Sequence, residues 1–172
     1  MRKTRASYRI WKRALTITAE DIQRQRTYLD ARAYVVFNPD EKRFQAKIPM
    51  TDPLIAQLVS RMRSMLGEHE VQEPVVLQSL AGCLQQEWHT DYDEDNRSGF
   101  SLLIALQDDT RLETPGKTIE LERGDLLVFR SDLVHAGSSY DRENLRIFLF
   151  CDLPTVKRRR NATYIRQWTN GS

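Results

Sequence analysis

Two of the three histidines in this 172-residue chain lie in patterns that suit a metal ion. His89 and Asp91 form a His-Thr-Asp motif, and side chains two residues apart on an extended strand project from the same face. A facial triad that binds Fe(II) needs a second imidazole from elsewhere in the chain. His135, in the apolar run Leu133–Ala136, is the predicted third ligand, whereas His69 lies in a polar stretch and is expected to face solvent. The sequence therefore predicts a metal centre of His89, Asp91 and His135.

Arg146 is the second sign of chemistry, because it interrupts the otherwise apolar run Leu145–Cys151. A buried guanidinium needs an anionic partner, since desolvating an unpaired charge is costly, and its planar fork suits a carboxylate. Arg146 follows His135 by eleven residues, which fits two neighbouring antiparallel strands joined by a turn. Each of these features alone has an ordinary structural explanation. Their conjunction favours a metal site with an anion-binding arginine.

The elements that must position these side chains fall into a helical part and a β part. Helices are expected from Thr18 to about Arg32, and from Pro53 until Gly67 ends the second one. Strands are expected at 33–37 and 44–48, with a turn at 38–41. Turn signals then separate short apolar runs, which predict an antiparallel sandwich or barrel; these runs are 75–80, 100–106, 118–121, 126–129, 133–136 and 145–151.

Length and composition indicate one globular α+β domain, mainly β. Residues 1–73 are expected to form a supporting helical and hairpin region, 74–154 the β core, and 155–172 a basic tail. No apolar run approaches the roughly 20 residues that span a bilayer, so no membrane partner is expected. The two cysteines have no zinc-like spacing, which favours a reducing, intracellular location, cytoplasmic by default, with nuclear and mitochondrial locations left open.

The chain ends are basic. Residues 1–13 carry six basic groups and residues 157–172 carry five, while all 24 acidic residues lie between them. Three interpretations are open: solvated tails, contact with a polyanion such as a nucleic acid, and a targeting signal. The sequence does not indicate an oligomeric state.

Four segments taken together resemble the Fe(II)- and 2-oxoglutarate-dependent dioxygenases: Trp88–Tyr92, Gly124–Phe129, Ser131–His135 and Arg146. The prolyl-hydroxylase and phytanoyl-CoA-hydroxylase-like branches are the most similar, and the resemblance covers residues 75–154. It implies a double-stranded β-helix, a cupin-like jelly roll, with iron on the predicted triad. It further implies that Arg146 pairs with the distal carboxylate of 2-oxoglutarate. Dioxygen would then be used to convert 2-oxoglutarate to succinate while a substrate C–H bond is hydroxylated.

The sequence departs from this family at the cosubstrate contacts. Phe148 stands where many members have a serine or threonine that helps to hold 2-oxoglutarate. Many members also have a tyrosine about ten residues before the first metal ligand, and Gln78 or Ser79 is the expected substitute here. The prime substrate is expected to be a peptidyl side chain or a small molecule.

Three alternatives stay open. The acidic stretch 91–95 resembles the nucleic-acid demethylases, although Asp152 stands where they carry a second arginine; such a stretch would also favour cationic substrates. A cupin-like metal enzyme could use Arg146 for a substrate carboxylate and need no 2-oxoglutarate. A non-catalytic jelly-roll module could bind a polyanion through its basic ends.

Overall fold

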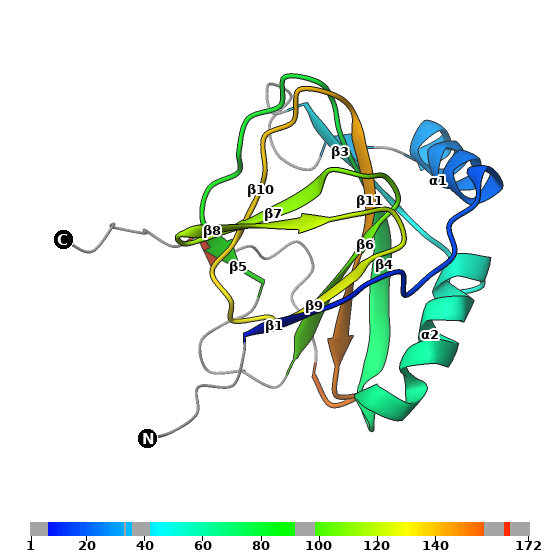
Figure 1. The fold of residues 1–172 in the computed structure, drawn as a ribbon. Coiled ribbons are helices and arrows are strands. Elements are labelled where there is room, and N and C mark those ends of the chain that lie inside the picture. The colour runs from blue at the N-terminus through cyan, green and yellow to red at the C-terminus, as the bar shows by residue number, and fades with distance from the viewer. Residues whose placement is uncertain (1–6, 33, 36–41, 92–98, 157–163, 166–172) are drawn as a thin grey trace.

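The computed structural model describes residues 7–32, 34–35, 42–91, 99–156 and 164–165. A seven-stranded antiparallel sheet dominates it, with the strand order β1-β9-β6-β11-β4-β3-β2 (Figure 1). Its strands are β1 (Tyr8–Trp11), β2 (Tyr34–Val35), β3 (Arg43–Lys47), β4 (Glu70–Ser79), β6 (Phe100–Ala105), β9 (Leu126–Arg130) and β11 (Asn144–Asp152).

Shorter strands face one side of this main sheet. A three-stranded sheet has the order β10-β7-β8, and a two-stranded sheet pairs β12 with β5. An isolated antiparallel bridge between His89 and His135 links these two pieces. The strands are β5 (His89–Thr90), β7 (Thr110–Thr114), β8 (Lys117–Leu121), β10 (Ala136–Gly137) and β12 (Tyr164–Ile165).

Two helices cover the opposite side of the main sheet (Figure 1). Helix α1 (Ala19–Arg32) begins with a reciprocal cap, in which the Thr18 hydroxyl accepts from Asp21 N and the Asp21 carboxylate accepts from Thr18 N. Helix α2 (Pro53–Leu66) begins where the Asp52 side chain accepts from Leu54 N, and it ends at Gly67, whose φ of +57° suits glycine. Both predicted helices are confirmed.

The main sheet carries an apolar cluster on each face. On the helix side, Ile147 and Leu149 of β11 pack with Ile55 and Leu58 of α2. On the other side, Leu103 and Phe129 pack with Leu112 and Ile119 of the short strands. Alternate residues of one strand therefore serve two layers, as the pleat requires.

Several sequence predictions were wrong. Residues 8–11 of the expected basic end form β1, the edge strand that pairs with β9. Residues 164–165 of the expected C-terminal tail form β12, which pairs with β5. The main sheet takes β1, β2 and β3 from the expected support region, so the boundary at residue 73 does not separate it from the β core.

The apolar run Leu133–Ala136 is also not a strand. Residues 131–132 form a turn, His135 makes the single bridge to His89, and β10 begins only at Ala136. The strand β7 was not predicted, because Leu112 is the only apolar residue among Thr110–Thr114 and gives no strand pattern. The expected turn at 38–41 and most of the acidic stretch 91–95 lie outside the described residues.

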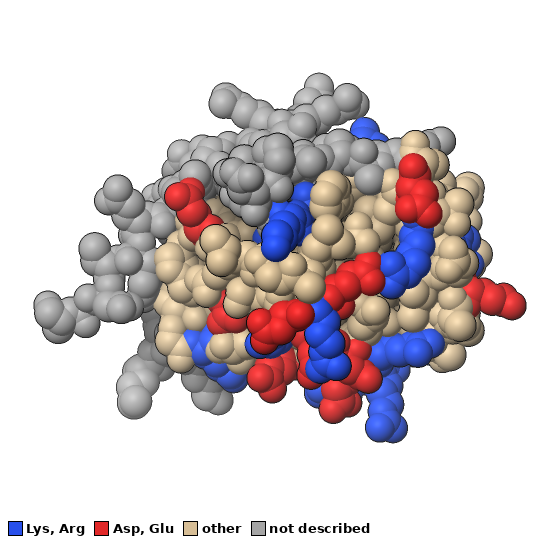
Figure 2. Space-filling model, turned by 90° about the horizontal axis from the view of Figure 1, so that it is seen from above, with Lys and Arg blue, Asp and Glu red and all other residues tan. Residues whose placement is uncertain are grey.

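Figure 2 shows one face of the molecule, on which the described acidic and basic residues are mixed rather than segregated. Acidic and basic side chains lie interspersed there, so its described residues form no patch of one sign for a polyanion. Contact of the basic ends with a polyanion stays a prediction. Neither described helix combines the length and apolar character that a bilayer span requires.

Asp125 fastens β1 to the rest of the fold. Its inaccessible carboxylate accepts from Lys12 Nζ at 2.7 Å and from the backbone N–H groups of Arg13 and Glu122, each at 2.9 Å. Burial alone would raise the pKa of the Asp125 carboxyl, but these hydrogen bonds outweigh burial and hold the pKa below its usual value.

We expect Asp125→Asn to lower the free energy of unfolding at pH 7 by about 1–3 kcal/mol, because an amide cannot accept at all these donors. A carboxyl with a depressed folded-state pKa stabilises the fold above its unfolded pKa of about 3.9, and the gain disappears as pH falls through the folded value. The difference between the variants in urea unfolding should therefore shrink below about pH 4. Asp109→Asn, at an exposed ion pair with Arg142, is the control and should have little effect.

Candidate metal centre

The two predicted imidazole ligands are held together by backbone hydrogen bonds. His89 N donates to His135 O, and His135 N donates to His89 O, both at 2.9 Å. The two rings consequently lie with their centroids 4.4 Å apart. Both side chains are buried, and the Phe129 ring packs edge-on against His135 at 4.9 Å.

Each imidazole has its protonation fixed by a carbonyl. His89 Nδ1 lies 2.8 Å from Glu87 O, and His135 Nδ1 lies 2.9 Å from Leu133 O. A carbonyl oxygen can only accept, so each Nδ1 carries the proton and donates it. In the neutral tautomer that this selects, Nε2 carries the lone pair that can bind a metal. Burial, together with the neighbouring His135, also lowers the pKa of His89 and favours its neutral form.

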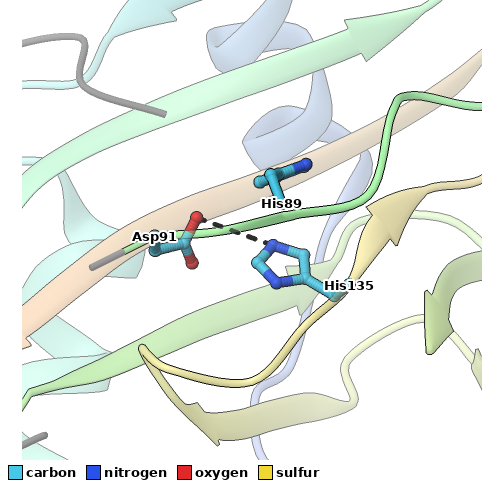
Figure 3. Close-up of side chains that lie close together, drawn as sticks. All are labelled: His89, Asp91 and His135. Atoms are coloured by element: carbon cyan, nitrogen blue, oxygen red, sulfur yellow. Dashed lines mark ion pairs between the residues drawn. The ribbon is translucent and has the colours of Figure 1, made fainter. Parts of the chain in front are cut away.

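Asp91 supplies a carboxylate beside these two rings (Figure 3). Its Oδ1 lies 3.5 Å from His135 Nε2, while its Oδ2 accepts from Ser101 Oγ at 2.5 Å. The main chain is anchored as well, because Asp91 N donates to Ser131 O. Ser101 thus orients the carboxylate so that Oδ1 faces the imidazoles.

The three ligand atoms of His89, Asp91 and His135 lie within 4.8 Å of one another. Two neutral imidazoles and one carboxylate are the donor set of non-haem Fe(II) sites, in which the remaining coordination positions stay open. The residues present therefore fit such a metal. The structure brings together all three ligands that the sequence predicted.

Arg146 is buried on β11, with only 5% of its surface exposed. Its Nη1 donates to Ser79 Oγ at 3.0 Å and to Asn144 Oδ1 at 3.4 Å, and its guanidinium carbon lies 5.5 Å from the centre of the Tyr140 ring. Among the residues that the structure describes, no carboxylate forms an ion pair with it. Neutral oxygens and a ring face leave the charge uncompensated, so the site suits an anion.

The two expected cosubstrate substitutes are separated by the pleat of β4. Ser79 is fully buried and contacts Arg146. Gln78 instead donates to Glu143 Oε1, which also pairs with Arg26 at 2.7 Å. The structure therefore brings Ser79 to the arginine and does not bring Gln78.

Phe148 lies two residues after Arg146 on the same strand and packs against the cluster around Leu103 and Phe129. At this position, where many proteins of the similar family have a serine or threonine, the chain thus has an apolar ring instead of a hydroxyl. His69, expected to face solvent, is half-exposed, and its ring lies 5.4 Å from that of Phe100.

Sequence reasoning missed two polar residues beside the site. Arg43, 3% exposed, donates to Ser79 Oγ, yet in the sequence it stands only one residue before an expected strand. Ser101 orients Asp91. The only feature of the sequence that could have indicated this role is the presence of a hydroxyl within the apolar run 100–106.

A scan against protein-family models and a search of curated proteins gave no match. Solved structures do match. They include a prolyl hydroxylase from Trichoplax adhaerens in complex with a hypoxia-inducible-factor peptide fragment, at TM-score 0.66, 15% identity, and coverage of 86% of this chain and 84% of that one.

Two further solved structures also match. HygX from Streptomyces hygroscopicus, with nickel, 2-oxoglutarate and hygromycin B bound, has TM-score 0.63, 11% identity, and coverage of 87% of this chain and 84% of that one. The non-haem α-ketoglutarate-dependent epimerase SnoN from nogalamycin biosynthesis has TM-score 0.69, 14% identity, and coverage of 85% and 78%.

The chain has the double-stranded β-helix fold. In this double-stranded β-helix, β9, β6, β11 and β4 of the main sheet face β5, β10, β7 and β8. The predicted fold class is confirmed. The three predicted ligands come from β5, from the residue after it and from the bridge before β10, and Arg146 comes from the facing sheet.

We expect Ser101→Ala to weaken the binding of Mn(II) by about 10-fold, because loss of an orienting hydrogen bond to a ligand typically costs 10–100-fold in metal affinity. Isothermal titration calorimetry with Mn(II) measures this directly. Ser139→Ala, at an exposed serine, is the matched control and should bind as the wild type does. Unchanged affinity in Ser101→Ala would show that Asp91 needs no such support.

Proposed function

We propose that this protein is an Fe(II)- and 2-oxoglutarate-dependent oxygenase that hydroxylates a peptidyl side chain or a small molecule. One observation carries the proposal: a buried guanidinium without a carboxylate partner among the described residues lies in the same double-stranded β-helix as a convergent His-Asp-His triad. A dicarboxylate cosubstrate satisfies both, since one end can chelate a metal and the other can pair with Arg146.

His89 Nε2, His135 Nε2 and Asp91 Oδ1 would hold the iron. When bound, iron with 2-oxoglutarate and dioxygen supplies the oxidising chemistry that yields succinate, carbon dioxide and a hydroxylated product. The chain's own part is to hold each imidazole proton on Nδ1 through the Glu87 and Leu133 carbonyls, which turns each Nε2 toward the metal, and to hold one carboxylate oxygen toward them.

Arg146 and Ser79 would bind the far carboxylate of the cosubstrate. Ser79 Oγ already accepts from the guanidinium groups of Arg43 and Arg146, at 2.9 and 3.0 Å. A hydroxyl has two acceptor lone pairs and one proton to donate. With both lone pairs used, its proton is directed to an incoming acceptor, such as a carboxylate oxygen. Phe148 would border this site with an apolar ring and limit the access of water.

Support for the substrate class comes from proteins of the same fold. One similar structure contains a peptide fragment and another contains hygromycin B, a small molecule. We therefore favour these two classes over a nucleic acid, and the mixed charges of the described face in Figure 2 agree with this choice.

We expect Arg146→Gln to weaken binding of 2-oxoglutarate to the Mn(II)-loaded protein by about 100-fold or more, since a charge-assisted pair to a carboxylate is lost in a buried site. Mn(II) affinity should stay within about threefold of the wild type. Calorimetry measures both, and Fe(II)-dependent succinate formation should fall in parallel. Arg142→Gln, at an exposed arginine nearby in sequence, is the control. Metal binding without any 2-oxoglutarate binding in the wild type would instead favour a cupin-like metal enzyme.

A further inference from the structure

A second buried arginine, Arg43, stands beside the proposed cosubstrate site. It is the cross-strand partner of Ser79, because β3 pairs with β4 at this register. Its Nη1 donates to Ser79 Oγ at 2.9 Å, the same oxygen that Arg146 contacts from β11. Two guanidinium groups therefore converge on one hydroxyl from opposite sides of β4.

The other end of the Arg43 fork binds main-chain carbonyls. Its Nη2 donates to Leu84 O at 2.7 Å and to Ser138 O at 2.6 Å, with Gly137 O at 3.3 Å. Leu84 belongs to the loop that leads to His89, and Gly137 and Ser138 follow His135. One side chain thus ties the two metal-bearing segments to Ser79.

The loop and the segment after His135 are held side by side at this point. Gln86 N donates to Gly137 O, and Gln86 Oε1 accepts from Gly137 N, each at 2.9 Å. A Cβ at Gly137 would clash with Gln86 Oε1 and lie 3.1 Å from Arg43 Nη1. Arg43 therefore fits closely against this junction and has little freedom to move.

We propose that Arg43 is a positioning residue for the cosubstrate, acting through Ser79; this inference rests on the proposed function. By donating to Ser79 Oγ, Arg43 takes one acceptor lone pair and helps to turn the hydroxyl proton toward the carboxylate that Arg146 binds. The planar fork offers one nitrogen to the hydroxyl and another to the carbonyls, whereas a lysine has a single nitrogen for all of them.

The test is calorimetric titration of 2-oxoglutarate into the Mn(II)-loaded protein, which reads binding without turnover. We expect Arg43→Gln to weaken binding about tenfold or more, and Mn(II) affinity to stay within about threefold. With Fe(II), the KM for 2-oxoglutarate should rise by a similar factor, while kcat for succinate formation changes little. Arg43→Lys, which keeps the charge and perturbs folding less, should lose affinity in the same direction by a smaller factor.

A double-mutant cycle with Ser79→Ala tests the route. If Arg43 acts through the hydroxyl, Arg43→Gln should cost much less in the Ser79→Ala background than in the wild type. The control is Arg24→Gln, which removes the ion pairs of Arg24 with Asp21 and Asp52 at the helices, and should lower the Tm but leave 2-oxoglutarate binding intact.

The outcomes separate the two proposals. Wild-type protein that binds Mn(II) but no 2-oxoglutarate contradicts the proposed function and, with it, the role of Arg43. Wild-type binding that Arg43→Gln leaves within twofold contradicts only the role of Arg43. Equal losses from Arg43→Gln in both Ser79 backgrounds also overturn that role, because the effect would then not pass through the hydroxyl.

Discussion

Two backbone hydrogen bonds between His89 and His135 are the constraint on which the candidate site depends. Each short sheet carries one of these residues or its neighbour, and the bridge joins the sheets into one surface facing the main sheet. Without the bridge, β5 and β10 would have no fixed distance, and the two imidazoles would not converge. Metal geometry here follows from main-chain pairing, which is stiffer than side-chain packing alone, and the carbonyls of Glu87 and Leu133 then fix each ring.

The main sheet allows this arrangement because its strands divide their side chains between two layers. Along β11, Leu145, Ile147 and Leu149 belong to the helix-side cluster, while Phe148 joins the cluster inside the barrel. Arg146 and Phe148 are two residues apart and therefore face the same side of the sheet, away from the helices. The cation of Arg146 is thus placed where the cosubstrate would lie. A register slip of one residue would exchange the two sets and bury the charge among the helices. The apolar residues on either side of Arg146 therefore also determine where its charge points.

The sequence alone predicts a functional role for a residue when its type is rare in the chain or unusual for its surroundings. His89, Asp91, His135 and Arg146 were found because imidazoles are scarce and a cation in an apolar strand is costly. Arg43 and Ser101 were missed, since their roles depend on cross-strand neighbours that no local pattern reveals. The edge strands β1 and β12 were missed for a related reason: their flanking basic residues indicate tails, whereas pairing with β9 and β5 depends on distant partners. The apolar run before His135 was misjudged because a turn, closed by Leu133 N to Arg130 O, interrupts it.

The place of β11 in the sheet also bears on how the chain folds. β4 and β6 are separated in the sheet by β11, which pairs with both, and β11 follows both in sequence. Before residues 144–152 are synthesised, the main sheet can exist only as two pieces, β2-β3-β4 and β6-β9-β1. Insertion of one central strand then joins them, and it brings Arg146 beside Ser79 in the same event. Such non-local closure is a slow step in folding, so the anion site and the finished sheet should form together, late and cooperatively.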